Sequence, residues 1–434
     1  MDPIALGLLS FLGMLSLIAV HVPVGIAMAI AGVAGFYAMT GNIHAAVSMF
    51  GSETATAISS PHLIIIPMFL LMGSFAGVSG LASDLYHLAN SLFGHRRGGL
   101  AMATVAGCGG FGAACGSSIA TTATMARIAL PEMERRGYAQ SLSAGSIAAG
   151  GTLGSLIPPS SIMLIYAFLT EQFVITLFIA GVIPGLLTIA IYFVAIQIVV
   201  RRNPALAPAG TRRSWAQTAR TAANSWGIVS IILIMTVGLY GGVFTVIEAA
   251  AAGTFIAFIF AIARGRLNRK TFFRTIGETA GNVGLLYTIL IGAHIFSNFI
   301  AITRMPAALV DWVVSLGLPA LAIIFVLAAI YIGLGAIFDS VAAMVITLPF
   351  VFPLVTDGLG YDPIWWGIVM IMVIEIGMIT PPIGINVFVM HGVRSDIPLG
   401  TIFRGIVSFL FADFVRLTLV ILFPAIALWL PRTM

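Results

Sequence analysis

Long apolar runs, separated by short polar stretches, follow one another along the whole chain. They fall at about residues 4–20, 23–39, 61–79, 100–130, 141–169, 173–200, 226–240, 243–263, 283–301, 319–356, 364–392 and 403–430. About 20 apolar residues form a helix long enough to span the hydrocarbon core of a bilayer. The pattern therefore predicts an all-α protein that crosses a membrane many times. For the first two runs a second interpretation stays open, in which residues 4–39 form one long tilted helix.

Two of the runs, 100–130 and 319–356, are too long for one span and too short for two spans with a loop. Each has small or polar residues near its middle, which is typical of a re-entrant helical hairpin that returns to the side from which it entered. Short amphipathic stretches at 82–93 and 303–316 predict arm helices that lie in the membrane interface. The alternative for these stretches is that they are simple connecting loops.

Clusters of arginine give the expected topology, because basic loops favour the cytoplasmic side. Arginine pairs flank the first hairpin, at 96–97 and 135–136, and further clusters occur at 201–220, which includes Arg212 and Arg213, and at 264–274. The stretch 356–362 after the second hairpin has no basic residue. We therefore expect the first hairpin to open to the cytoplasm, the second to open to the opposite side, and both chain termini to lie outside the cytoplasm.

Composition supports a membrane protein and excludes several other classes. Of the 434 residues, 60% are hydrophobic and only 8% are charged, whereas soluble domains have about 25% charged residues. The net charge of +5 comes from arginines between apolar runs, which argues against a nucleic-acid surface. Two cysteines, Cys108 and Cys115, cannot complete a four-ligand zinc site and are interpreted as small residues in a packed segment. The first run lacks a basic n-region, so we expect it to be retained as a span.

The two halves of the chain share a spacing pattern. The pairs Pro158-Pro159 and Pro381-Pro382 are 223 residues apart (381 − 158). The interval from Ser118 to Pro131 is 13 residues, as is the interval from Ser340 to Pro353. Together with the opposite openings of the hairpins, this pattern predicts an inverted repeat, a design that many secondary transporters use.

Four segments carry the candidate chemistry: the hairpin centres at 107–124 and 333–340 and the proline pairs within 151–161 and 375–386. Glycines allow the backbone to leave helical geometry, and paired prolines remove backbone donors and break a helix. The freed carbonyls suit a cation, and the N-termini of half-helices suit a carboxylate. The alternative is that these small residues only allow close helix packing.

A few charged residues stand out within the apolar runs. Asp339, at the centre of the second hairpin, is expected to coordinate a cation, unless water holds that tip. Glu375 begins a break and faces either a cation or solvent. Arg127 either attracts an anionic substrate or snorkels to the cytoplasmic surface. Asp413 is expected to be structural, and so are Glu53 and Glu248.

These segments resemble the large membrane subunit of TRAP transporters, the tripartite ATP-independent periplasmic carriers. The resemblance rests on residues 66–73, 116–124, 131–138, 151–160, 181–185 and 377–386, and so extends through almost the whole chain. It implies an importer of a carboxylate-bearing organic acid in the bacterial inner membrane, coupled to Na⁺ with two or more Na⁺ per cycle. The implied partners are a small four-helix membrane subunit and a periplasmic substrate-binding protein.

The resemblance also implies an elevator mechanism, in which a transport domain slides against a scaffold. The implied division has scaffold helices at 1–80, an arm helix at 81–99, a transport domain at 100–170 and scaffold helices at 171–302. A second arm at 303–318, a transport domain at 319–393 and a C-terminal scaffold helix at 394–434 follow. Carried onto this sequence, the cation ligands would be Ser117, Ser118, Gly154 and Pro158 at one site, and Gly335, Asp339, Gly377 and Thr380 at a second. Substrate would lie near Ser118, Pro159, Ser160, Pro382 and Asn386, with Arg127 as a further candidate.

Other functions remain as alternatives. The nearest is a di- or tricarboxylate carrier, coupled to Na⁺ or H⁺, that works without a binding protein. An intramembrane enzyme is disfavoured because the sequence has no His-Glu-x-x-His pattern and no cluster of nucleophile and base. A passive channel is the third alternative.

Overall fold

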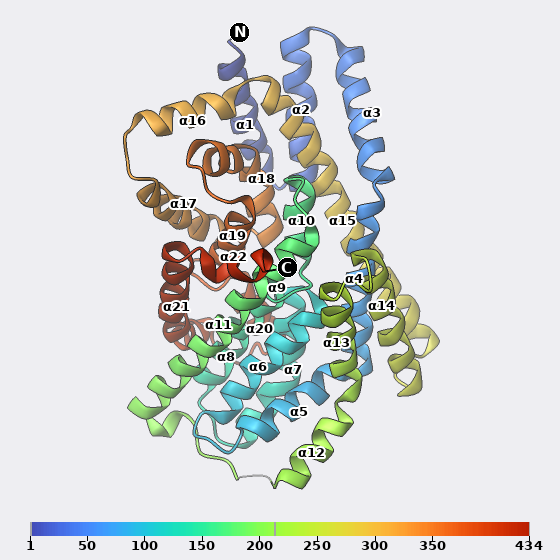
Figure 1. Ribbon diagram of the computed structural model, residues 1–434, viewed down its shortest axis with the longest axis vertical. Coiled ribbons are helices and arrows are strands. Elements are labelled where there is room, and N and C mark those ends of the chain that lie inside the picture. The colour runs from blue at the N-terminus through green and yellow to red at the C-terminus, as the bar shows by residue number, and fades with distance from the viewer. Residues whose placement is uncertain (1, 212–213, 434) are drawn as a thin grey trace.

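The computed structural model describes residues 2–211 and 214–433, and every regular element within these ranges is a helix (Figure 1). The first half forms α1 (Pro3–Ala19), α2 (Val24–Thr40), α3 (Ile43–Ser59), η1 (Pro61–Ile64), α4 (Ile65–Ser79), α5 (Leu81–Phe93), α6 (Gly99–Cys115), α7 (Ser118–Arg135), α8 (Gln140–Gly151), α9 (Leu153–Leu156), α10 (Ser161–Leu169) and α11 (Val174–Arg202). The second half forms η2 (Pro204–Leu206), α12 (Trp215–Asn224), α13 (Trp226–Tyr240), α14 (Val246–Ala263), α15 (Arg269–Ile302), α16 (Met305–Ser315), α17 (Ala320–Gly335), α18 (Ser340–Pro353), η3 (Leu354–Gly358), α19 (Pro363–Gly377), α20 (Ile385–Val393), α21 (Leu399–Leu422) and α22 (Ala425–Arg432). Arg212 and Arg213 of the basic loop lie outside the described residues.

The helices are those of a multi-pass membrane protein. Six helical stretches in the described residues are long and apolar enough to cross a membrane, and counting the bent pairs α4–α5 and α12–α13 raises the number to eight. Large apolar side chains such as Phe173, Phe411 and Trp429 are exposed on the surface. Lipid tails can cover such side chains, and helices satisfy their own backbone hydrogen bonds in the bilayer. The predicted all-α, multi-pass character is therefore confirmed.

Helix α3 occupies residues 43–59, where the apolar pattern predicts no element. Its sequence contains His44, Ser52, Glu53 and Thr54, which lower its hydropathy below that of the flanking runs. It is nonetheless free of proline, and the Asn42 side chain caps its first turn by accepting from the amides of residues 44 and 45. The local helix signals were present, but a search for apolar runs overlooks them.

The first two apolar runs form two separate helices. α1 ends at Ala19, α2 begins at Val24, and the two pack against each other. Between them His21 has a positive φ of 68°, which is incompatible with a continuous right-handed helix. The alternative of one long helix over 4–39 is therefore wrong.

Helices end at the four segments that the glycines and prolines mark. α6 and α7 pack as a hairpin joined at Gly116 and Ser117, and α17 and α18 form a second hairpin joined by residues 336–339. The prolines interrupt the helices between α9 and α10, at 157–160, and between α19 and α20, at 378–384. Both Pro-Pro peptide bonds are cis.

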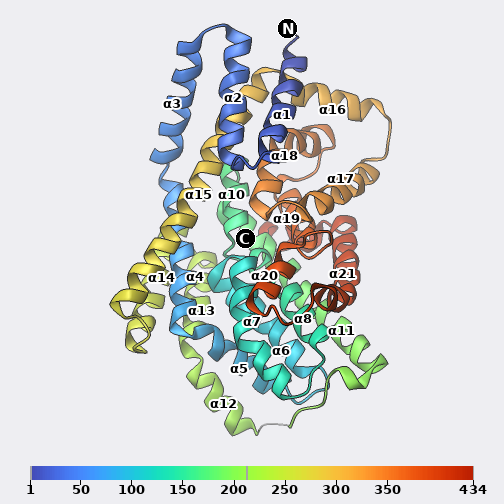
Figure 2. The same ribbon diagram turned by 180° about the vertical axis from the view of Figure 1, so that it is seen from behind.

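The arm helices α5 and α16 lie at opposite ends of the molecule (Figures 1 and 2). α5 turns by 68° from the end of α4, and it lies at the end that also holds α12. α16 lies at the other end, with the N-terminus and α1 to α3. Both predicted interfacial stretches are therefore helices and not irregular loops.

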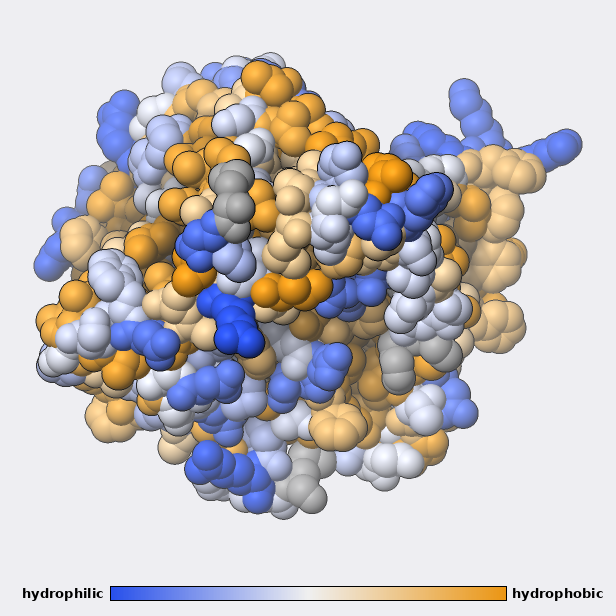
Figure 3. All heavy atoms as spheres, turned by 90° about the horizontal axis from the view of Figure 1, so that it is seen from above, coloured by the Kyte–Doolittle hydropathy of each residue, from blue (hydrophilic) through white to orange (hydrophobic). Residues whose placement is uncertain are grey.

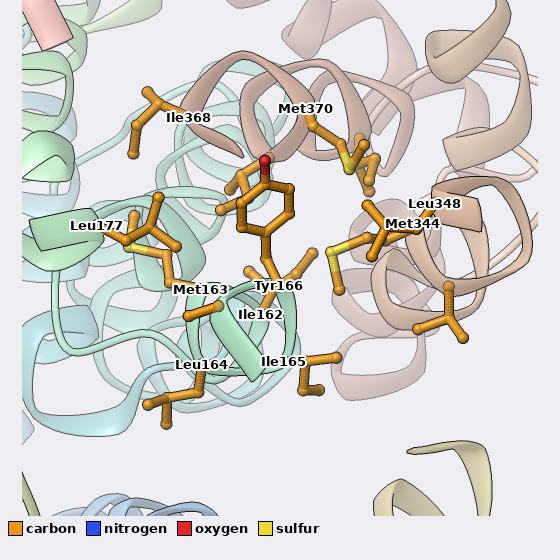
Figure 4. Close-up of a cluster of buried hydrophobic side chains, with 14 of the residues drawn as sticks. Ile162, Met163, Leu164, Ile165, Tyr166, Leu177, Met344, Leu348, Ile368 and Met370 are labelled. Atoms are coloured by element: carbon orange, nitrogen blue, oxygen red, sulfur yellow. The ribbon is translucent and has the colours of Figure 1, made fainter. Parts of the chain in front are cut away.

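The main core joins the two halves of the chain. Tyr166 of α10 lies between Leu177, Ile368 and Met370, with Met344 of α18 on a third side (Figure 4). The Tyr166 hydroxyl donates to the Pro363 carbonyl at 2.6 Å, at the start of α19. Burial of these side chains therefore fixes the first broken helix against the second hairpin and the second broken helix.

Candidate functional site

The first hairpin is tied to the helix break of its own half. Ser117 caps α7, and its hydroxyl accepts from the Ala120 amide at 3.4 Å. The Ser161 amide, at the start of α10, donates to the Gly116 carbonyl at 3.0 Å. The Ser118 amide donates to the Ser155 hydroxyl at 3.2 Å. The hairpin tip and the break therefore form one unit.

The first predicted cation set is brought together in this unit. A Cβ atom on Gly154 would lie 2.6 Å from the Ser117 carbonyl oxygen, so the two backbones are in direct contact. Ser118 is buried beside them, and Pro158 is half-buried in the break. The hydroxyls of Thr121 and Thr122 are buried here and have no hydrogen-bond partner in the part of the chain that the structure describes. Unpaired buried oxygens of this kind are available ligands for a hard cation.

The second hairpin repeats the arrangement. Asp339 caps α18, and one of its carboxylate oxygens accepts from the amides of Val341 and Ala342 at 2.9 and 3.1 Å. The Gly384 amide, at the start of α20, donates to the Ala336 carbonyl at 3.4 Å. This hairpin tip is therefore also bonded to the break of its own half.

The second predicted cation set lies around this contact. A Cβ atom on Gly335 would lie 2.7 Å from the Ile374 carbonyl oxygen, and one on Gly377 would lie 2.6 Å from Gly335 Cα. Only glycine fits at either position. The Thr380 hydroxyl is already engaged, because it donates to the Ile376 carbonyl at 2.6 Å. Within the described ranges no cluster of three or more His, Cys, Asp or Glu could hold a metal ion, so a cation at this tip would need backbone carbonyls and hydroxyls beside the Asp339 carboxylate.

Glu375 links the two halves at the centre of the site. It is fully buried, and the Ser118 hydroxyl donates to its Oε1 at 3.5 Å. Its Oε2 has no hydrogen-bond partner among the described residues. A buried carboxyl group with an unsatisfied oxygen is costly unless it binds a proton or a cation. Of the two environments that the sequence leaves open for Glu375, solvent is therefore wrong for this conformation.

The residues predicted to bind substrate are only partly brought together. Ser118, Pro159 and Ser160 are buried at the first tip and break, and the Ser160 hydroxyl caps α10 by accepting from the Met163 amide at 3.4 Å. Asn386 is buried against α8, where its Nδ2 donates to the Ala148 carbonyl at 3.4 Å, and its Oδ1 has no partner within residues 2–211 and 214–433.

The other two candidates are exposed. Pro382 lies in the exposed part of the second break. Arg127 is exposed on α7, nine residues beyond Ser118, which corresponds to about 13 Å along the helix. The structure therefore separates Arg127 from the tips.

A buried charged network beside the site contains Asp413, which the sequence predicts to be structural, together with Arg416, which the sequence pattern alone does not single out. Arg416 and Asp413 of α21 form a fully buried ion pair, with 2.8 Å between Arg416 Nε and Asp413 Oδ1. Arg416 donates to the Thr188 hydroxyl at 2.7 Å, and the Tyr192 hydroxyl donates to Asp413 at 2.8 Å, so the network joins α21 to α11. The signal that could have found it is the spacing of two opposite charges three residues apart in an otherwise apolar helix.

Ion pairs join the halves again at the end that holds α12. The Arg394 guanidinium, after α20, binds both oxygens of Glu134 on α7 at 2.8 and 2.9 Å. It also binds Asp396 at 2.7 Å, which holds the pKa of the Asp396 carboxyl below its ordinary value and raises the pKa of Arg394. The first hairpin and the second broken helix are thereby connected at their outer ends as well as at the tips.

A cavity of about 520 Å³ opens at the opposite end, between α15, α16 and the second hairpin. Its apolar side includes Leu348 and Phe352, and its charged lining residues are Arg304, Asp311 and Asp357. Figure 3 looks onto this end, where hydrophilic side chains lie scattered among apolar ones. None of the predicted site residues lines this cavity.

Comparison with known proteins gives a consistent result. Residues 11–426 match the family described as "Tripartite ATP-independent periplasmic transporter, DctM component". The chain is 39% identical over 373 residues to the C4-dicarboxylate TRAP transporter large permease protein DctM of Pseudomonas aeruginosa, which covers 85% of this chain and 86% of that protein. It is 30% identical over 424 residues to the ectoine/5-hydroxyectoine TRAP transporter large permease protein UehC of Ruegeria pomeroyi, covering 97% of each.

The fold also resembles that of a solved transporter. The crystal structure of the YdaH transporter of Alcanivorax borkumensis superposes with a TM-score of 0.62 at 12% sequence identity, covering 91% of this chain and 90% of that one. At this identity the likeness concerns the fold alone.

Proposed function

The chain belongs to the DctM-component family of tripartite ATP-independent periplasmic transporters, and we propose that it is the large translocating subunit of a Na⁺-coupled importer of a carboxylate-bearing organic acid. As a member of this family of transporter permeases it is not an enzyme. The observation that carries the proposal is the pair of hairpin tips, each hydrogen-bonded to the helix break of its own half. Such discontinuous helices place carbonyls and helix N-termini at the membrane interior, where ions and anionic substrates need them.

We propose that the two halves are inverted repeats. Element starts recur at a nearly constant offset: 222 residues from α2 to α14 (246 − 24), 224 from α5 to α16 (305 − 81) and 223 from α8 to α19 (363 − 140). The arm helices α5 and α16 lie at opposite ends, as an inversion requires. With the arginines of the α12 end in the cytoplasm, the first hairpin is re-entrant from the cytoplasm and the second from the periplasm.

We propose that transport follows an elevator mechanism in which both hairpins and both broken helices move as one block. The contacts Ser118–Glu375 and Arg394–Glu134 support a single block, because each joins the two halves. Scaffold and arms would be those assigned from the sequence, with one difference. α21 packs closely on α8 at Gly145 and Gly405, and α11 is joined to α21 by the Asp413–Arg416 network. These contacts favour α11 and α21 travelling with the block.

We propose that the cations bind at the two tip–break units. The first unit suits a cation better than the second, because hydroxyls that have no partner among the described residues lie beside the Ser117 carbonyl. Glu375, which has one unsatisfied oxygen, lies next to this unit. At the second, Asp339 still has one carboxylate oxygen without a capping role. Substrate would lie between the tips, at Ser118, Pro159, Ser160, Pro382 and Asn386, with Arg127 outside this group and on its approach.

The proposed setting is the bacterial inner membrane, with the α16 end in the periplasm. A periplasmic binding protein would deliver the substrate there, and a separate small membrane subunit would complete the transporter. The relatives are named for C4-dicarboxylates and for ectoines, so family membership leaves the individual substrate open.

Uptake by the reconstituted transporter tests the proposal. Proteoliposomes that contain this chain and its small subunit should take up substrate only with the loaded binding protein outside and an inward Na⁺ gradient. Uptake at an equal rate without the binding protein would favour the carrier of di- or tricarboxylates that works alone. Downhill flux of substrate at a rate that does not depend on the Na⁺ gradient would favour a channel.

A further inference from the structure

A groove of about 440 Å³ runs between α11 and α21 on the outer surface of the molecule. Its walls are one stripe of each helix, with Ile191, Val194 and Ile198 on α11 and Phe411 and Val415 on α21. Phe411 and Val194 are 69% and 58% exposed, so the groove opens to the surroundings of the protein and not to its core. At membrane depth those surroundings are lipid chains.

The length of the groove matches one leaflet. From Ile191 to Arg202 the helix rises by about 16 Å, and half of the hydrocarbon core of a bilayer is about 15 Å thick. The apolar stripe therefore extends from about the middle of the membrane to the headgroup region of one leaflet. By the topology proposed above, this is the cytoplasmic leaflet.

The groove ends in uncompensated positive charge. Arg202 lines this end, and Arg201 lies beside it in the sequence. Among the described residues neither forms an ion pair, and Arg404 at the start of α21 donates only to the Gly400 carbonyl. The acidic residue of α21, Asp413, is buried and paired with Arg416. No carboxylate of these two helices therefore neutralises the Arg202 end.

We propose that this groove binds an anionic phospholipid, with one acyl chain along the apolar stripe and the headgroup phosphate at Arg202. The guanidinium offers charge-assisted hydrogen bonds to phosphate oxygens, and basic positions between membrane helices on the cytoplasmic side suit anionic headgroups. The apolar groove would hold the acyl chain, and Arg202 would favour lipids whose headgroup is anionic. The proposal does not depend on the transported substrate or on the coupling ion.

Native mass spectrometry of the full chain tests the proposal. The protein is titrated with phosphatidylglycerol and phosphatidylcholine that carry identical acyl chains, and the retained lipid is counted. Wild type should retain phosphatidylglycerol in preference, and Arg202→Gln should reduce that preference about fivefold. Arg201→Gln is the matched control, since it removes the same charge one residue away but does not line the groove. Ala195→Phe, which fills the groove without changing charge, should lower retention of both lipids.

Two results would overturn the proposal. One is equal retention of both lipids by wild type. The other is an equal loss in the two arginine variants, which would mean that the arginine only snorkels in a generally basic surface. If Arg202→Gln cannot be purified, two other variants test the proposal. Ala195→Phe should retain less lipid than wild type, and Arg202→Lys should still retain phosphatidylglycerol in preference.

Discussion

At the residue scale, the two acidic side chains near the tips do different things. Asp339 is half-buried and uses one oxygen to cap α18. Glu375 is fully buried, and one of its oxygens has no hydrogen-bond partner among the residues described. The sequence favours Asp339 over Glu375 as a cation ligand, whereas in the structure Asp339 also caps α18. Any test of Asp339 must therefore separate its charge from its cap.

Replacing Asp339 by Asn makes this separation. Asparagine keeps the side-chain oxygen that accepts from the Val341 and Ala342 amides, so the helix cap should survive. Loss of the charge should raise the Na⁺ concentration for half-maximal uptake about tenfold, the effect of removing one charged ligand. Na⁺-dependent uptake into proteoliposomes measures this, and thermal unfolding should be unchanged.

Asp362→Asn is the matched control for this prediction. Asp362 caps α19 in the same way, by accepting from the amides of Ile364 and Trp365, but it lies at the far end of that helix from the break. Its replacement should leave Na⁺ dependence unchanged. Wild-type Na⁺ dependence in Asp339→Asn would show that Asp339 is a cap and nothing more.

Single residues were predictable from the sequence where their effect is local. The caps and breaks depend on neighbours within a few residues, so Ser117 and Pro158 could be placed from the printed sequence. The Ser118–Glu375 contact joins residues 257 apart, and it depends on how the halves pack. Nothing in a single sequence gives that packing, so the sequence alone allows Glu375 to face either a cation or solvent.

At the element scale, glycine and proline predicted helix ends better than hydropathy predicted helices. Both breaks and both hairpin tips fall where these residues interrupt the apolar runs. Hydropathy missed α3, and it placed only residues 283–301 of the 34-residue α15 in a span. The polar first turns of α15 are helical because Asn268 caps them, its side chain accepting from the Thr271 amide at 2.8 Å.

The contact between α17 and α19 gives a prediction at this scale. Gly335→Ala would place a Cβ atom 2.7 Å from the Ile374 carbonyl oxygen, so the second hairpin must move away from its break. Overpacking of this kind costs about 1–3 kcal/mol. We expect a lower melting temperature and uptake reduced by about tenfold or more, measured by thermal unfolding and by initial uptake rates.

Gly333→Ala tests whether the position matters or only the added methyl group. Gly333 lies on the same helix, and an added Cβ would meet no atom within 4 Å. Stability and uptake should equal those of wild type. If Gly335→Ala also behaves as wild type, α17 and α19 are not held in the close contact on which the proposed second cation site depends.

At the scale of the whole molecule, apolar packing and polar contacts both hold the halves together. The apolar packing lies in the main core around Tyr166. The polar contacts include the buried hydrogen bonds of Glu375 and Asp413 and, near the α12 end, the ionic contact of Arg394 with Glu134. The ionic contact is partly exposed, so it contributes little to the free energy of unfolding. Its position matters more, because it couples the first hairpin to the second broken helix.

Arg394→Gln should therefore reduce transport more than stability. Without the guanidinium, α7 and α20 lose their link at the α12 end, and the proposed transport block should move less coherently. We expect uptake to fall about three- to tenfold while the melting temperature changes by only a few degrees, as for a partly exposed ion pair. Initial uptake rates and thermal unfolding measure the two effects.

The pH dependence has a definite sign. Arg394 lowers the pKa of Asp396, so this interaction favours the folded state above the ordinary range of an aspartate and is lost as pH falls through the lowered value. Any stability difference between wild type and Arg394→Gln should therefore be constant near neutral pH and shrink in acid. Arg404→Gln is the matched control, because Arg404 is exposed and bonds only a backbone carbonyl. Equal loss of uptake in both variants would mean that the basic surface as a whole matters, and that the Arg394 link does not join the halves into one moving block.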